Sequence, residues 1–362
     1  IKDQSFYFEN ALEFLDDEGE WFLTSESHEL FYKARREEDI GSIVFVAPRL
    51  VRLLQVQGKP DAPIKHIHFV DLVFQDSTWL EPSEEGFATH QADNIFKGTQ
   101  LGYQIPAAIH VQDAENLRFE HNTFRNMGAT AVSLWGGVRD TVLLSNTFED
   151  IAASAISIAM NLTERRGDPS ETCRNNIIQN NFIQRAGRDY HSSVGIFAGY
   201  TEGLVIDHNE LTDLPYTGIS VGWGWTLKKT ALKNNLIRRN RIHNVMNQLA
   251  DGGGIYTLSR QPGTTIIENH VFNMARSAWA GFSSLAAIYL DEGSSLITLK
   301  DNLLENVPVG IDFHRAQDNT IINNRSLFQE RWQAYNNHFL DDGTIDLKRI
   351  RANAGIGVSG SQ

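Results

Sequence analysis

The chain has 362 residues, a single cysteine and a formal net charge of −13 at pH 7. One cysteine excludes a disulfide framework within the chain. The acidic balance argues against a nucleic-acid-binding protein, which would carry a basic surface, and makes an acidic substrate less expected. Since no segment reaches eighteen consecutive apolar residues, the sequence predicts no membrane partner.

The first part of the chain differs in its residue pattern from the rest. Two short hydrophobic runs, 20–23 and 29–32, flank a Ser/Glu turn, and residues 43–46 form a third run. We expect residues 1–62 to form a small N-terminal β element packed on a solenoid, because the open end of a solenoid exposes unpaired strand edges.

An asparagine unit recurs about every thirty residues after this element. Each Asn is followed two positions later by a hydrophobic residue, and then usually by Asn or Asp. A repeat of this length with variable loops is typical of a solenoid. We expect each Asn at an inward bend, where its amide binds turn backbone and stacks on the next coil's Asn. The units begin at Asn122, Asn146, Asn180, Asn209, Asn240, Asn269 and Asn302.

A second repeat, five residues long, follows the asparagine units. Position one is small, and positions two and four are almost always apolar, which predicts a short half-buried strand. Because partner strands lie a full coil apart in sequence, their sheet must be parallel. The sequence therefore predicts an all-β fold, a single-stranded parallel β-helix over 63–325 with a C-terminal cap and tail at 326–362. These strands begin at Ala108, Ala131, Ala155, Gly195, Gly218, Gly254, Ala287 and Gly310.

Side chains at positions three and five should point out of this ladder. In the last three coils they include polar and aromatic groups: Tyr256, Tyr289, Asp291, Asp312 and His314. Asp291 is expected one rung, roughly 4.8 Å, from His314 and diagonal to Asp312. A lone surface Asp is usually only solvated, and His314 could equally be a buried structural histidine. Three titratable groups beside two tyrosines nevertheless indicate a functional site.

Asp251 is a second candidate, because it precedes three glycines. A loop that brings its backbone close to a ligand would use such glycines, whereas a regular strand would not tolerate them. An Asx-turn before Gly252 is the alternative.

Seven strings in the chain resemble the right-handed parallel β-helix proteins related to glycoside hydrolase family 141. They are residues 8–15, 19–22, 30–32, 194–200, 215–225, 251–258 and 288–295. The resemblance extends over about residues 6–355 and implies a carbohydrate substrate, no cofactor and no metal. Members of this group include an α-L-fucosidase and a xylanase. Such proteins usually carry further coils ahead of the point where this chain begins, so we expect a truncated or processed piece of a secreted or periplasmic protein, acting as a monomer.

The resemblance also implies that Asp251 and Asp291 are the catalytic carboxylate pair of a glycoside hydrolase. A straight strand would hold them roughly 20 Å apart, so only a sharp fold at Gly252–Gly253 would bring them within catalytic distance. Without that fold, Asp291 with Asp312 or Glu292 is the better pair. We expect Asp291 to be the general acid, because aromatic rings and a second carboxylate favour its protonated form.

Aromatic side chains near these residues are candidate sugar platforms. Gly222 and Gly224 would leave neighbouring indoles accessible, and the 160–176 loop, with Glu164, Arg165 and Arg166, is a candidate lip. The candidate platforms are Tyr200, Tyr216, Trp223, Trp225 and Trp279, beside Tyr256 and Tyr289.

Two other functions remain open. A β-helix polysaccharide lyase would need a Ca²⁺-binding cluster of carboxylates and a basic residue on neighbouring outward positions, and no such basic residue is present there. A non-catalytic carbohydrate-binding solenoid would bind sugar without using either carboxylate.

Overall fold

A computed structural model describes residues 7–24, 26–79, 88–89, 91–92, 94–97, 100–159, 171–326, 336–341, 343 and 345–357. The expected lip residues Glu164, Arg165 and Arg166 lie outside these ranges. Two compact units divide between Pro48 and Arg49.

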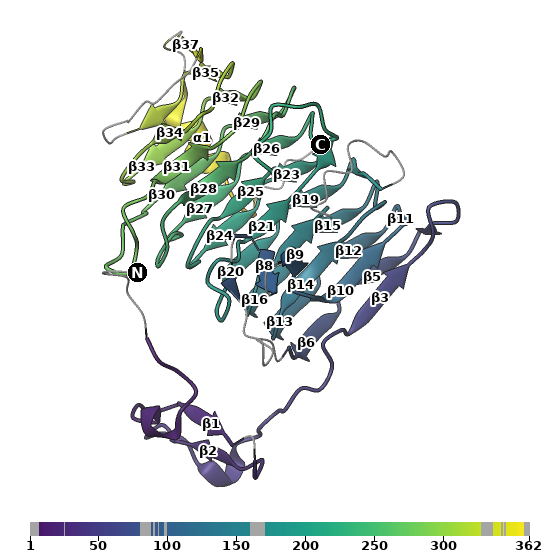
Figure 1. Ribbon diagram of the computed structural model, residues 1–362, viewed down its shortest axis with the longest axis vertical. Coiled ribbons are helices and arrows are strands. Elements are labelled where there is room, and N and C mark those ends of the chain that lie inside the picture. The colour runs from purple at the N-terminus through teal and green to yellow at the C-terminus, as the bar shows by residue number, and fades with distance from the viewer. Residues whose placement is uncertain are drawn as a thin grey trace. The chain divides into compact units, whose positions relative to one another are not determined.

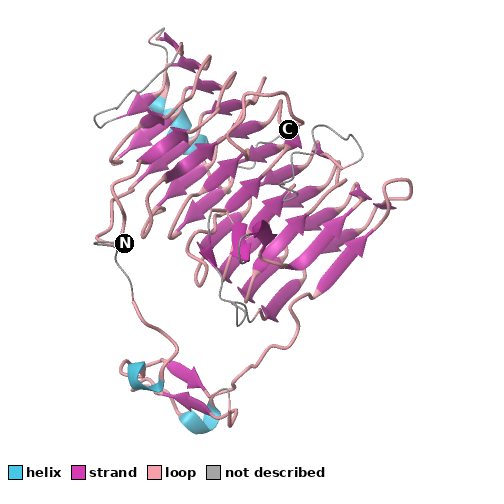
Figure 2. Cartoon of the chain, viewed as in Figure 1, coloured by secondary structure: helices cyan, strands magenta, loops and turns pink. Residues whose placement is uncertain are grey.

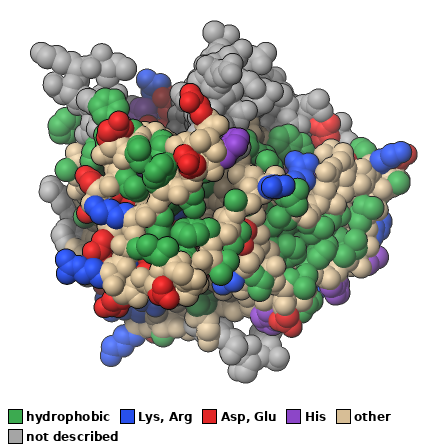
Figure 3. Space-filling model, turned by 90° about the horizontal axis from the view of Figure 1, so that it is seen from below, with side chains coloured by type: hydrophobic (Ala, Val, Ile, Leu, Met, Phe, Trp, Pro, Cys, Tyr) green, Lys and Arg blue, Asp and Glu red, His purple; other side chains and the backbone are tan. Residues whose placement is uncertain are grey.

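The first unit is a small β element. Strands β1 (Trp21–Leu23) and β2 (Leu30–Tyr32) pair antiparallel, and two 3₁₀ turns, Leu12–Phe14 and Ile40–Ser42, flank them. None of its described residues is buried. Large apolar side chains such as Phe8 and Trp21 are therefore exposed. Hydrophobic side chains also gather in patches on the face of the protein seen in Figure 3.

The second unit is built from three long parallel sheets, whose strands follow one another along its axis (Figure 1). Among the described residues the first sheet has nine strands: β3 (Leu54–Gln57), β10 (Ala107–Gln112), β14 (Thr130–Leu134), β17 (Ile156–Ile158), β21 (Ile196–Ala198), β25 (Ile219–Val221), β28 (Gly252–Thr257), β31 (Leu285–Leu290) and β34 (Ile311–Phe313).

The second sheet has ten strands within the described ranges: β5 (His68–Val70), β12 (Arg118–Glu120), β15 (Val142–Leu144), β19 (Ile177–Gln179), β23 (Val205–Asp207), β26 (Leu236–Arg238), β29 (Thr265–Ile267), β32 (Thr298–Lys300), β35 (Thr320–Ile322) and β37 (His338–Leu340). The third has nine in the same ranges: β6 (Val73–Ser77), β13 (Thr123–Met127), β16 (Thr147–Ile151), β20 (Phe182–Ala186), β24 (Glu210–Thr212), β27 (Arg241–His243), β30 (His270–Phe272), β33 (Leu303–Glu305) and β36 (Arg325–Ser326).

Strands dominate the chain (Figure 2), and the remaining elements are short. They are the parallel pairs β4 (Ile64–Lys65) with β11 (Ala114–Glu115) and β18 (Cys173–Arg174) with β22 (Thr201–Glu202), the antiparallel β7 (Ala88–Thr89), β8 (Asn94–Lys97) and β9 (Gln100–Gln104), and helix α1 (Leu347–Asn353). The chain is a right-handed parallel β-helix, as the sequence predicts.

The five-residue repeat forms the first sheet in the predicted register. Ile109 pairs with Val132, and Ile255 pairs with Ile288, so each position two lies on the next. These side chains are fully buried and form the core between the sheets. Burial of one such aliphatic side chain stabilises the fold by about 1.5–3 kcal/mol.

The asparagine repeat also forms a continuous ladder, with one correction. The backbone N–H of Asn146 donates to Oδ1 of Asn181 at 2.9 Å, and Nδ2 of Asn146 donates to the carbonyl of Phe119 at 2.9 Å in the preceding coil. The ladder residue is thus Asn181 and not the predicted Asn180. The ladder runs through Asn122, Asn146, Asn181, Asn209, Asn240, Asn269, Asn302 and Asn324.

Strand pairing extends beyond the predicted limits of the solenoid. Strand β3 pairs with β10 before residue 63, and β37 pairs with β35 within the predicted cap. Helix α1 lies against the third sheet, where Arg349 pairs with Glu268 at 2.6 Å and Arg351 pairs with Glu305.

The outward face of the first sheet is less exposed than predicted. Ser157, Phe197 and Ser220 occupy position three and are all buried. Phe197 packs against the edge of Trp223, with ring centroids 6.2 Å apart, so the segment after β25 covers the neighbouring strand. The period-two pattern identifies the outward side of the strands, but not what covers it.

Candidate active site

Asp291 follows β31 directly and lies at the centre of a hydrogen-bonded cluster. Its backbone N–H donates to the carbonyl of Thr257 at 3.0 Å, which fixes it to the preceding coil. Its carboxylate accepts hydrogen bonds from the hydroxyl of Tyr256 at 2.5 Å, the hydroxyl of Tyr289 at 3.3 Å and Nδ1 of His314 at 2.7 Å. Asp291 is only 6% exposed, so these three donors replace most of its hydration.

The two tyrosines are paired residues of neighbouring strands, β28 and β31. Their rings meet edge to face with centroids 5.3 Å apart. Burial, followed by the field of Asp291, raises the pKa of each hydroxyl well above its usual range. Both tyrosines therefore remain protonated donors at any physiological pH, and their donated hydrogen bonds stabilise negative charge on Asp291.

Asp251 lies just before β28, with a left-handed backbone at φ 66°. Its side chain is exposed and has no hydrogen-bond partner among the described residues. Loss of hydration to the surrounding protein, and then the field of Asp291, raise its pKa. A carboxyl group with a raised pKa is suited to act as a general acid.

The predicted loop at the three glycines is wrong. Gly252 to Gly254 belong to the extended strand β28, so the chain has no sharp fold there. The glycines are needed because neighbouring atoms come too close for a side chain: a Cβ at Gly252 would lie 2.4 Å from Oγ1 of Thr217, and one at Gly254 would lie 2.5 Å from Cγ1 of Val271. The field of Asp291 nevertheless contributes to the raised pKa of Asp251, so the two carboxyl groups influence each other without the expected bend.

Ser284 connects Asp251 with Asp312, and no sequence pattern predicts this contact. The carbonyl of Ser284 accepts the backbone N–H of Asp251 at 2.7 Å, and its hydroxyl donates to Oδ2 of Asp312 at 2.6 Å. Oδ1 of Asp312 accepts the backbone N–H of Phe313 at 2.9 Å. Burial, and then the fields of Asp291, Asp251 and Asp312, raise the pKa of Tyr289.

Glu292 is directed differently from Asp291. Its carboxylate pairs with Arg315 at 2.8 Å, and this arginine is well exposed. Its negative charge contributes to the raised pKa of Asp251. Asp312 has both oxygens occupied by local donors, and Glu292 is held by an arginine, so neither is as available to a substrate as Asp251.

Tyr216 holds the backbone of Asp251 in place. Its hydroxyl donates to the carbonyl of Asp251 at 2.5 Å and accepts from Nε2 of Gln91 at 2.9 Å. Tyr216 is buried, so it positions Asp251 and cannot offer its face to a sugar.

The predicted sugar platforms divide into buried and exposed rings. Trp223 is 4% exposed and Tyr200 is also buried, so the glycines beside Trp223 do not make its indole accessible. Trp225 is 47% exposed and packs against Trp223 with ring centroids 5.6 Å apart. Trp279 is 53% exposed. Gly222 and Gly224 instead have positive φ, at 99° and 82°, which favours glycine there.

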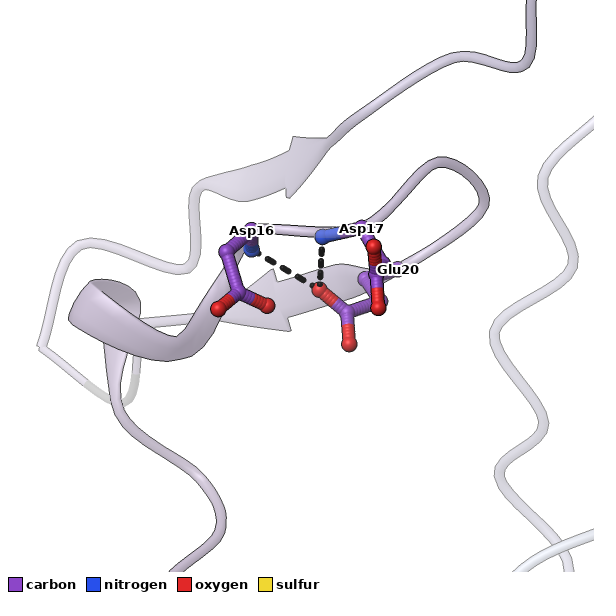
Figure 4. Close-up of side chains that lie close together, drawn as sticks. All are labelled: Asp16, Asp17 and Glu20. Atoms are coloured by element: carbon purple, nitrogen blue, oxygen red, sulfur yellow. Dashed lines mark hydrogen bonds between the residues drawn. The ribbon is translucent and has the colours of Figure 1, made fainter.

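One acidic group in the first unit has the spacing of a cation site. Asp16, Asp17 and Glu20 lie close together in an exposed turn (Figure 4). Oε2 of Glu20 accepts the backbone N–H groups of Asp16 and Asp17, at 2.9 and 2.8 Å, so this carboxylate already has a role in closing the turn. No helix in the described ranges is long and apolar enough to cross a membrane.

A family model described as a right handed beta helix region matches residues 70–226 and 174–330. The chain belongs to this family. No curated protein matches this β-helix.

A solved structure named "Glycoside hydrolase" is 28% identical to this β-helix with a TM-score of 0.80, covering 96% of this chain and 60% of that chain. This chain therefore spans less than two thirds of that protein. A Streptococcus pneumoniae surface protein and adhesin, PfbA, is 14% identical, with a TM-score of 0.41 and coverage of 77% and 75%. A GH136 lacto-N-biosidase from Eubacterium ramulus is 12% identical, with a TM-score of 0.34 and coverage of 80% and 60%.

Proposed function

We propose that this β-helix is a glycoside hydrolase with Asp251 and Asp291 as its two catalytic carboxyl groups. The observation that carries the proposal is the contrast between them. Asp291 accepts three hydrogen bonds in a buried position, whereas Asp251 is exposed, has a raised pKa and is influenced by Asp291. Two carboxyl groups in unlike environments are what glycoside hydrolysis requires.

In this proposal Asp251 is the acid and Asp291 the ionised group, the reverse of the sequence-based expectation. Protonated Asp251 donates its proton to the glycosidic oxygen as the bond to the anomeric carbon breaks. Asp291 either attacks that carbon or removes a proton from a water molecule that attacks it. His314, bonded to Asp291 through Nδ1, leaves Nε2 on a half-exposed ring to bind a sugar hydroxyl.

The similarity to the solved glycoside hydrolase supports the same reaction class, since it covers nearly all of this chain. For the substrate, we propose an α-L-fucoside or a xylan-type oligosaccharide, following the resemblance to glycoside hydrolase family 141. A secreted or periplasmic enzyme would meet such substrates.

The first experiment is a product screen against α-L-fucosides, xylans and pectic oligosaccharides. It uses the wild type, Asp251→Asn, Asp291→Asn and, as a matched control, the exposed Asp318→Asn. We expect reducing sugar from the wild type and the control, and a loss of about 10²–10⁴-fold in each catalytic variant. NMR detects which anomer of the product is formed first, and this identifies retention or inversion.

Other outcomes separate the remaining functions. Unsaturated products that absorb in the ultraviolet and vanish with a chelator would identify a lyase. Sugar binding without turnover, unchanged in both Asn variants, would identify a binding solenoid.

A further inference from the structure

The segment from Arg276 to Ser283, which we call the bracing loop, joins β30 to β31 and is held in shape by its own side chains. The guanidinium of Arg276 donates to the carbonyls of Gly281 and, at 2.7 Å, Ser283. The hydroxyl of Ser277 donates to the carbonyl of Gln248 at 3.2 Å and accepts the backbone N–H groups of Trp279 and Ala280. These bonds fix the loop to itself and to the preceding coil.

This fixed loop exposes two aromatic rings. Phe282 is fully exposed, and Trp279 is 53% exposed. An aromatic ring that faces water forgoes the favourable free energy that burial of its apolar surface would provide. Because the loop is already ordered, a ligand that covered these rings would gain this burial free energy without the entropic cost of ordering the backbone.

The bracing loop ends at the candidate active site. Ser284, the next residue, accepts the backbone N–H of Asp251 and donates to Asp312. Phe282 is two residues earlier, and two residues span at most about 7 Å. The backbone of Phe282 therefore lies close enough to Asp251, the proposed acid, for one short oligosaccharide to reach both. The same stretch of backbone is fixed at Ser284 by its hydrogen bonds to Asp251 and Asp312.

We propose that the bracing loop is a substrate subsite, in which Phe282, with Trp279, binds a sugar unit that is not itself cleaved. This proposal rests on the proposed function and extends it: the enzyme would favour oligosaccharides over single glycosides. Flat apolar rings such as these stack on the C–H face of a sugar.

The test compares a long substrate with a minimal one. Two substrates are assayed with wild type, Phe282→Ala and Phe282→Leu. One is an oligosaccharide that is cleaved in the product screen. The other is the glycosyl fluoride of its terminal sugar, whose fluoride leaving group is too small to reach a second subsite. We expect KM for the oligosaccharide to rise roughly tenfold in both variants, with no change for the fluoride. Phe339→Ala, at another exposed ring, is the control and should match wild type.

Leu keeps apolar area but not the flat face, so wild-type KM in Phe282→Leu would overturn the stacking proposal. Equal losses on both substrates would also overturn it, because they would indicate damage to the site.

A binding measurement makes the result independent of turnover. The affinity of Asp251→Asn for the oligosaccharides of the screen is measured by calorimetry, with and without Phe282→Ala. Roughly tenfold weaker binding with Phe282→Ala supports the subsite even if no hydrolysis is found, in which case only the proposed function fails. Unchanged affinity, or no binding of any of these oligosaccharides, overturns the subsite.

Discussion

The hydroxyl of Tyr256 lies 2.5 Å from Oδ2 of Asp291, and this is the shortest of the three hydrogen bonds that the carboxylate accepts. The second tyrosine, Tyr289, is 3.3 Å from the other oxygen. A short bond to an ionised acceptor is worth more than a long one. The two tyrosines should therefore contribute unequally to catalysis.

We expect Tyr256→Phe to lower kcat by about tenfold or more, and Tyr289→Phe to lower it less, with KM largely kept in both. The comparison is matched, because both changes remove one hydroxyl from a buried ring. Steady-state kinetics on one substrate provide the measurement. Equal effects, or a larger effect of Tyr289→Phe, would contradict the assigned geometry.

Leaving-group dependence should separate the roles of Asp251 and Asp291. The leaving group of a 2,4-dinitrophenyl glycoside, 2,4-dinitrophenolate, departs without being protonated. Asp251→Asn should therefore cleave this substrate at close to the wild-type rate, although it cleaves a natural glycoside slowly. Asp291→Asn should stay impaired on both substrates. The reverse pattern would exchange the two roles and restore Asp291 as the acid.

The alkaline limit of activity should follow the charge around Asp251. Its raised pKa keeps the acid protonated to higher pH, so activity falls as pH rises through that pKa. Glu292 is one of the charges that raise it, and Glu292→Gln should move the alkaline limb of kcat/KM to lower pH. Glu268→Gln, an ion-paired carboxylate against α1, is the control. A limb that moves equally in both variants would exclude this explanation.

Adjacent asparagines offer a direct test of the ladder. Asn181 is fully buried and links three coils, whereas Asn180 is only partly buried and binds Ser145 and Gly357. Asn181→Ala leaves buried donors unpaired and should cost about 2–4 kcal/mol, and Asn180→Ala about 1 kcal/mol or less. Urea unfolding measures both. A larger cost at Asn180 would contradict the register found here.

Much of the fold could be predicted because its signals repeat. Ile109, Val132 and Ile156 recur at one position in successive coils, and that recurrence fixes both the strand and its register. Where two asparagines are adjacent, the same logic fails: Asn180 and Asn181 fit the pattern equally well, and only the pairing of Phe148 with Ile183 decides between them.

The site was less predictable than the fold. The ladder placed Asp291 beside His314, because both lie on consecutive rungs. It could not show that Ser284 would bind Asp312, since Ser284 lies outside the five-residue repeat. Nor could three glycines in a row reveal whether the chain bends or is crowded, because either cause selects residues without a side chain.

The ladder asparagines from Asn122 to Asn302 each bind the coil before and the coil after, as Asn146 does through Phe119 and Asn181. No inner coil can therefore peel away alone, because its departure breaks bonds on both sides. Tension applied along the axis would be shared by the whole stack, and rupture should begin at an end such as Asn324, which within the described residues hydrogen-bonds only to the coil before it.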